Sequence, residues 1–122
     1  MTSLFRRIRP YSFRITIDLI ARLLKIPKSL IVKAECWAYV LFVHRQDQGG
    51  QFISYRKLAQ WLESIVQLIH ETPTFDDLWQ LGLWIKQETE KFEYPKAVLQ
   101  YLRKIWAKHR DYLRSLPDPG SF

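Results

Sequence analysis

The segment from Pro95 to Leu116 is the longest with an unbroken helical pattern, and prolines bound it on both sides. Proline is tolerated in the first turn of a helix, whereas Pro117 and the pair Pro119–Gly120 stop one. Apolar side chains recur here at the spacing of one helix face, and basic side chains recur on another. The segment therefore predicts a long helix that packs against a core on one side and presents positive charge on the other.

Charge is unevenly distributed along the 122 residues, whose net charge is +7. The first 33 residues hold eight Lys/Arg against Asp18 alone, residues 34–95 hold five basic and nine acidic side chains, and residues 96–114 hold six basic and one acidic. Two basic ends attract polyanions, of which nucleic acid is the first candidate. The predicted phosphate contacts are Arg6, Arg7, Arg9, Arg14, Arg22, Lys25, Lys28, Lys96, Arg103, Lys104, Lys108, Arg110 and Arg114.

Four earlier segments also show helical periodicity, at residues 12–26, 28–46, 54–71 and 74–91. The second is apolar around most of its circumference, which predicts a central position in the fold. The chain has only four glycines and no repeated pattern of short strands and turns. The sequence therefore predicts an all-α fold, a compact bundle of about five helices.

The length and the 48% hydrophobic content suit one domain with its own core. We expect a basic arm at residues 1–11, a helical-bundle domain at 12–116 and a short tail at 117–122. The arm either orders on a phosphate backbone or is a frayed terminus. The lone Cys36 excludes an internal disulfide and fits a cytoplasmic protein. We expect neither a secretory signal nor a membrane-spanning helix, because the longest apolar run falls short of the roughly 20 residues required.

Motifs for metal or cofactor binding are not recognisable in this sequence. His44, His70 and His109 lack the local spacing of a zinc site. Asp76 and Asp77 are explained by the start of a helix, where acidic side chains favour the positive end of the helix dipole. We therefore predict no metal and no cofactor.

Arg103 and His109 form an Arg-x5-His pattern on the last predicted helix. This pattern resembles the active-site motif of the HEPN ribonucleases, which cleave RNA without a metal, usually across a dimer. That family usually has Asn, Asp or His after the arginine, where this chain has Lys104. The resemblance implies an alternative function as a ribonuclease, with Arg103 and His109 as the catalytic pair.

In length, predicted helical class, tryptophan content and charge layout, the chain is similar to the small subunit of CRISPR interference complexes. The resemblance implies a cytoplasmic subunit of a larger ribonucleoprotein in antiviral defence. Such a subunit touches RNA or single-stranded DNA through basic side chains and contacts other protein subunits. We therefore predict sequence-independent binding of the nucleic-acid backbone, without enzymatic activity. A second alternative is an adaptor that binds a protein or, less favoured, lies on an anionic membrane surface.

Overall fold

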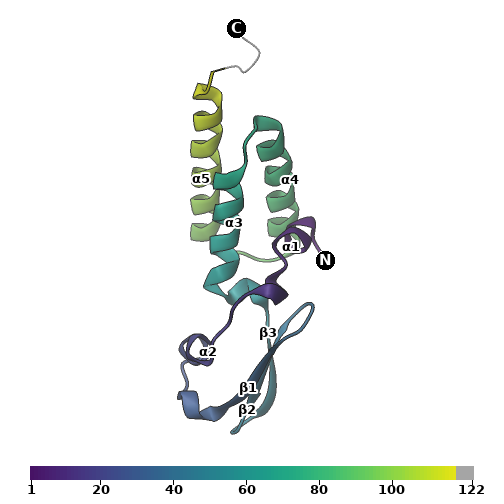
Figure 1. Cartoon of the computed structure of the whole chain (residues 1–122), viewed down its shortest axis with the longest axis vertical. Coiled ribbons are helices and arrows are strands. Elements are labelled where there is room, and N and C mark those ends of the chain that lie inside the picture. Colours follow the sequence, from purple (N-terminus) through teal and green to yellow (C-terminus); the bar gives the residue numbers. More distant parts are fainter. Residues whose placement is uncertain (118–122) are drawn as a thin grey trace. The chain divides into compact units, whose positions relative to one another are not determined.

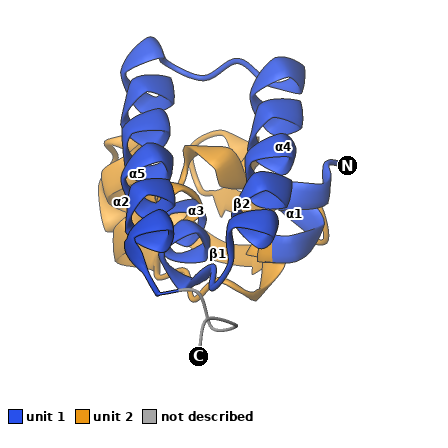
Figure 2. Cartoon of the chain, turned by 90° about the horizontal axis from the view of Figure 1, so that it is seen from above, with its two compact units in different colours: residues 1–7, 64–122 blue, residues 8–63 orange. Residues whose placement is uncertain are grey.

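The computed structural model describes residues 1–117, so the predicted tail lies outside the described residues except for Pro117 (Figure 1). The helices are α1 (Ser3–Ile8), α2 (Ile17–Leu24), α3 (Ala59–Glu71), α4 (Phe75–Lys91) and α5 (Lys96–Ser115). The strands are β1 (Ile31–Cys36), β2 (Leu41–Arg45) and β3 (Gly49–Ile53). Residues 1–7 and 64–122 form one compact unit, unit 1, and residues 8–63 form another, unit 2 (Figure 2).

The prediction of an all-α bundle was wrong, because unit 2 contains a three-stranded antiparallel sheet in the order β1-β2-β3. The sheet replaces the central helix that was predicted over residues 28–46 and extends beyond it into β3. Burial along β2 alternates residue by residue: Leu41 and Val43 are buried, while Phe42 is partly exposed. This period of two is that of a strand with one face against a core.

The turn between β1 and β2 explains why the helical pattern was misleading. It spans Trp37 to Val40, and the Trp37 backbone N–H donates to the Val40 carbonyl oxygen at 3.0 Å. The turn contains no Gly, Pro, Asn or Asp, the residues that usually mark a hairpin. The sequence therefore gives no turn signal between these two strands. Read as one segment, their apolar residues fit the pattern of a single long apolar helix.

The second turn, by contrast, has a clear signal. Arg45 of β2 and Gly49 of β3 are paired, and the loop between them has three residues. Gly49 follows this loop and has a φ of 76°, a left-handed conformation that glycine adopts readily. The buried Arg45 side chain donates from Nε and Nη2 to the two Asp47 carboxylate oxygens, at 3.0 and 2.8 Å. These bonds hold the pKa of Asp47 below its ordinary value.

Acid is therefore expected to weaken this hairpin. Because the pKa of Asp47 is lower in the folded chain, its contribution to stability is present above the unfolded pKa of about 4 and is lost as the pH falls further. Replacing Asp47 with asparagine should flatten the decline of stability below pH 4, as measured by urea unfolding across the acid range. An unchanged pH profile in Asp47→Asn would contradict this coupling.

Helices α2 and α3 are shorter than the helices predicted at residues 12–26 and 54–71. Helix α2 begins after Thr16, whose hydroxyl oxygen accepts from the Leu19 N–H, and not after Ser12. Ser54 caps a short 3₁₀ turn, and α3 follows at Ala59. The core positions of unit 2 are Ile20, Ala21, Ile31, Leu41, Val43, Ile53, Tyr55, Leu58 and Trp61.

Residues 1–11 do not form an extended arm. Leu4 and Phe5 of α1 are buried, and the Thr2 hydroxyl donates to the Glu88 carboxylate of α4 at 2.5 Å. Glu88 is fully buried and also accepts from the Tyr94 hydroxyl at 3.0 Å. The start of the chain is thus tied to α4 through a buried carboxylate, an arrangement with no local sequence signal.

Helices α4 and α5 agree well with the prediction. The Thr74 hydroxyl oxygen accepts from the Asp77 N–H and caps α4, which confirms that this helix starts where the segment 74–91 was predicted to begin. Helix α5 ends one residue before Leu116 and begins directly after Pro95, which is its N-cap. Within unit 1 these two helices pack along each other and form the walls of the groove described next.

Candidate nucleic-acid interface

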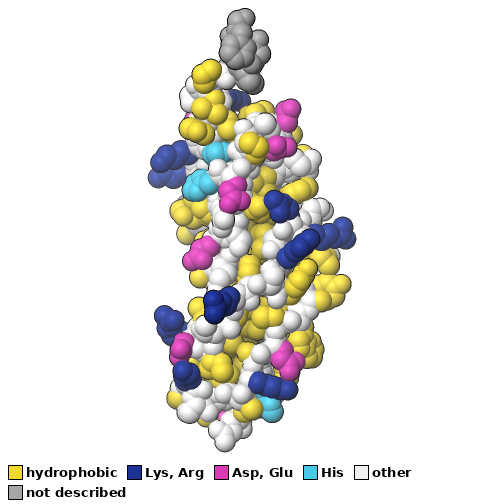
Figure 3. Space-filling model, in the orientation of Figure 1, with side chains coloured by type: hydrophobic (Ala, Val, Ile, Leu, Met, Phe, Trp, Pro, Cys, Tyr) yellow, Lys and Arg dark blue, Asp and Glu magenta, His cyan; other side chains and the backbone are white. Residues whose placement is uncertain are grey.

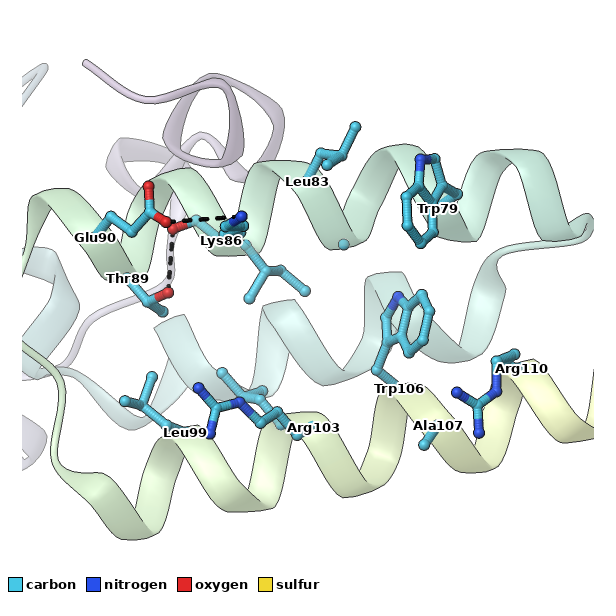
Figure 4. Close-up of a pocket in the computed structure, with 13 residues that line it drawn as sticks. Trp79, Leu83, Lys86, Thr89, Glu90, Leu99, Arg103, Trp106, Ala107 and Arg110 are labelled. Carbon is cyan, nitrogen blue, oxygen red and sulfur yellow. Dashed lines mark hydrogen bonds and ion pairs between the residues drawn. The ribbon is translucent and has the colours of Figure 1, made fainter.

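A groove of about 780 Å³ lies between α4 and α5 of unit 1 (Figure 4). Helix α4 contributes Trp79 and Lys86 to its walls, and α5 contributes Arg103, Trp106 and Arg110. Trp79 and Trp106 lie on opposite walls, with the Arg103 side chain farther along the groove (Figure 4). The apolar lining is Leu83, Ile85, Leu99, Leu102 and Ala107, together with Gly82.

Gly82 sets how closely the two helices approach. A Cβ atom at this position would lie 3.0 Å from Nε1 of Trp106. That nitrogen donates to the Leu78 carbonyl oxygen on α4, also at 3.0 Å. The absence of a side chain at Gly82 therefore lets the Trp106 indole contact the backbone of α4.

The groove has a positive balance of charge. Its charged lining residues are three basic side chains, Lys86, Arg103 and Arg110, and one acidic side chain, Glu90. Lys86 and Glu90 lie 4.0 Å apart and are both well exposed, so their attraction is weak. The Arg110 guanidinium lies 5.7 Å from the Trp106 ring centre, and its Nε also donates to the exposed carboxylate of the adjacent Asp111 at 3.2 Å.

The predicted phosphate contacts are distributed over both units. Arg6, Arg7 and the six basic residues of α5 belong to unit 1, and the other five belong to unit 2. All of them are exposed except Arg110, which is half-buried. On the face drawn in Figure 3, Lys and Arg side chains are interspersed with apolar and acidic ones. Of the thirteen, Arg103 and Arg110 line the groove.

The structure does not bring Arg103 and His109 together. Arg103 lines the groove, whereas Nε2 of His109 donates to the Thr72 carbonyl oxygen at 2.7 Å. His109 also lies beside the Tyr112 ring, 5.6 Å between centres. A pair acting on one phosphate would need both side chains at the same point. Within residues 1–117, no three His, Cys, Asp or Glu side chains gather in a way that could hold a metal ion.

Besides Lys86, sequence reasoning missed Trp79 as a groove residue. Its side chain is 55% exposed, although the helical pattern placed it beside the apolar face of α4. The neighbouring Leu83 is also exposed, at 45%. Positions 79 and 83 lie one turn apart, and this spacing of large apolar residues was the available signal.

Comparison of the chain with models of protein families, with curated proteins and with solved structures gave no match. Within residues 1–117, no helix combines the length and the apolar character needed to cross a membrane.

Proposed function

We propose that this chain binds single-stranded nucleic acid in the groove between α4 and α5. The observation that carries the proposal is the groove lining, in which basic side chains outnumber acidic ones three to one beside an exposed tryptophan. Arginine recognises phosphate through several N–H donors, and an aromatic ring can stack on any base. Both contacts are independent of sequence.

The two groove arginines, Arg103 and Arg110, would each contact a different phosphate group. Arg103 and Arg110 lie seven residues apart on α5, which is about 10 Å along a helix. They would therefore contact separate phosphates of one strand. Trp79, on the opposite wall, would stack on a base between them. A duplex keeps its bases stacked internally, so it would gain the phosphate contacts alone.

The resemblance to small subunits of CRISPR interference complexes now rests on length, tryptophan content and charge layout alone, because the predicted all-helical class was wrong, and it gives this activity a setting. In that setting the chain would hold a stretch of nucleic acid inside a larger ribonucleoprotein, beside other protein subunits. Membership of such an assembly stays a prediction. Binding by the isolated chain is the part that can be tested first.

Reversing both groove arginines, with Arg103→Glu and Arg110→Glu together, is expected to lower the affinity for single strands at least 100-fold. Loss of two phosphate contacts should also make log affinity fall less steeply with log salt, by about 1.4 for single strands. Fluorescence anisotropy with short labelled RNA and DNA strands and duplexes, titrated between about 50 and 200 mM salt, measures both quantities.

The matched control reverses Lys104 and Lys108, which lie on the same helix, are exposed and do not line the groove. It changes the net charge by the same amount, and we expect less than a tenfold loss of affinity. Equal losses in the two double variants would place binding in the general field of α5 and contradict the groove. No binding of any strand at low salt would overturn the proposed function.

A further inference from the structure

Three aromatic side chains gather on one face of the sheet in unit 2. Phe42 of β2 and Phe52 of β3 are paired directly across the two strands, so they project from the same face. Trp37, which follows β1, lies against both rings. We call these three residues the aromatic platform. It lies in the β1–β2–β3 sheet of Figure 1 and does not include any residue of the groove.

The platform rings pack on one another and leave no space between them. Trp37 and Phe42 are stacked, with ring centres 4.9 Å apart and planes 15° apart. Phe52 lies 5.5 Å from Trp37 and 5.6 Å from Phe42. An aromatic cage for a methylated ammonium group needs rings held apart around a cavity. The platform offers outer ring surfaces instead, which suits a flat ligand.

Neighbouring residues hold the platform in place. Gly50 lies beneath Phe42, since a Cβ atom there would come within 2.8 Å of the Phe42 ring. The Trp37 indole N–H donates to the Glu35 carboxylate at 2.9 Å, and Lys33 lies 3.0 Å from the same carboxylate group. Trp37 first and Lys33 second lower the pKa of Glu35 below its ordinary value. These contacts orient the Trp37 ring beside Phe42 and Phe52.

The platform is exposed although it is apolar. Phe52 is 62% exposed and Trp37 is 43% exposed, and both belong to one contiguous cluster. Single exposed aromatic side chains are common, but a preformed cluster on a sheet face is typical of a binding surface. Phe42 is half-buried between Gly50 and Trp37, so Phe52 and Trp37 present the outer surfaces.

The net charge of unit 2 indicates which kind of ligand the aromatic platform would bind. Residues 8–63 hold nine Lys/Arg and four Asp/Glu, a net charge of +5. A second copy of this unit would be repelled, whereas a polyanion would be attracted. A polyanion with flat apolar faces is a nucleic acid whose bases are unpaired.

We infer that the aromatic platform stacks on the bases of a single-stranded nucleic acid, with Phe52 as the principal contact. The inference rests on the proposed function, because it assumes that the chain binds nucleic acid, but it uses a different unit. It adds a second stacking contact to the one that Trp79 would supply in the groove. Single strands would gain stacking at the platform, and duplexes would not.

The test compares full-length wild type with Phe52→Ala and Phe52→Leu, using the same labelled strands and duplexes. Stacking on one base is worth about 1–3 kcal/mol, so Phe52→Ala should lower single-strand affinity at least about fivefold. Phe52→Leu keeps an apolar side chain but has no ring face, and we expect a similar loss. Duplex affinity and the salt slope should stay as in wild type, because no phosphate contact is removed.

Tyr101→Ala is the matched control, since this side chain is 48% exposed on α5 and lies outside both the platform and the groove lining. We expect it to bind single strands as wild type does. An unchanged affinity in Phe52→Ala, or an equal loss for duplexes, would overturn the platform while the effect of Arg103 and Arg110 could still stand. Failure of wild type to bind any strand would overturn both proposals. Circular dichroism and thermal unfolding of each variant confirm that the fold is intact.

Discussion

Replacing Tyr55 with alanine is expected to lower the free energy of unfolding by about 4 kcal/mol, the largest effect we predict for a single substitution. Tyr55 is fully buried in unit 2 and meets the Phe13 ring edge-on, 6.3 Å between centres. Its hydroxyl donates to the Trp37 carbonyl oxygen at 2.6 Å, in the turn between β1 and β2. Alanine would leave a cavity and an unpaired carbonyl. Chemical unfolding followed by circular dichroism measures the loss.

Two further variants test this explanation: the first isolates the hydrogen bond, and the second is a control at an exposed tyrosine. Tyr55→Phe keeps the ring and removes the hydrogen bond, so it should destabilise by only about 1 kcal/mol. Tyr11→Ala removes a ring that is 47% exposed in the same unit, and we expect a change within about 0.5 kcal/mol. A loss in Tyr55→Ala no larger than in Tyr11→Ala would contradict the central position of Tyr55.

Tyr55 should also make the fold sensitive to alkali. Burial, and then the nearby Cys36 side chain, raises the pKa of the Tyr55 hydroxyl above its ordinary value of 10.0. Above pH 10 the unfolded chain would therefore lose this proton first, and stability would fall as the pH rises. Wild type should lose stability more steeply above pH 10 than Tyr55→Phe does. Parallel profiles would show that Tyr55 does not titrate differently in the two states.

Replacing Glu88 with alanine is expected to lower the free energy of unfolding by about 3 kcal/mol. The carboxylate is fully buried in unit 1 and accepts hydrogen bonds from the hydroxyls of Thr2 and Tyr94. Alanine would leave both hydroxyls without this acceptor. Because Thr2 also accepts from the Phe5 N–H, α1 should lose order first. Hydrogen exchange of residues 3–8 and chemical unfolding measure the two consequences.

Glu90→Ala is the matched control for this prediction. Glu90 lies on the same helix two residues farther on, and its side chain is 67% exposed. Its distant pairing with Lys86 is worth little, so we expect a change within about 0.5 kcal/mol. Equal destabilisation by Glu88→Ala and Glu90→Ala, or unchanged exchange in α1, would contradict the role of the buried carboxylate.

The two proposed contact surfaces belong to different units, and the variants designed for them report different terms of binding. The groove supplies phosphate contacts through Arg103 and Arg110, which should appear in the salt dependence. The aromatic platform supplies stacking through Phe52, which should appear in the preference for single strands. The two sets of variants can therefore be interpreted independently.

The accuracy of sequence reasoning differed between the two units. In unit 1, the bounds of α4 and α5 were predicted closely, because Thr74, Pro95 and Pro117 act within a few residues of the helix ends that they define. In unit 2, the run from Leu30 to Val43 was assigned to the wrong class. An apolar run without turn residues fits a buried helix and a strand pair equally well, and only pairing with a distant segment decides between them.

The sequence alone determined the number and position of the basic side chains and the extents of the two last helices, since composition and helix caps are local properties. The tertiary structure determined which residues from distant segments are in contact. It buried Glu88 against Thr2, placed Phe42 beside Phe52 across two strands and brought Trp106 against Gly82. These contacts join segments that are far apart in the chain. Their free energies include the entropy cost of closing the loop between the two segments, which a local sequence pattern does not reveal.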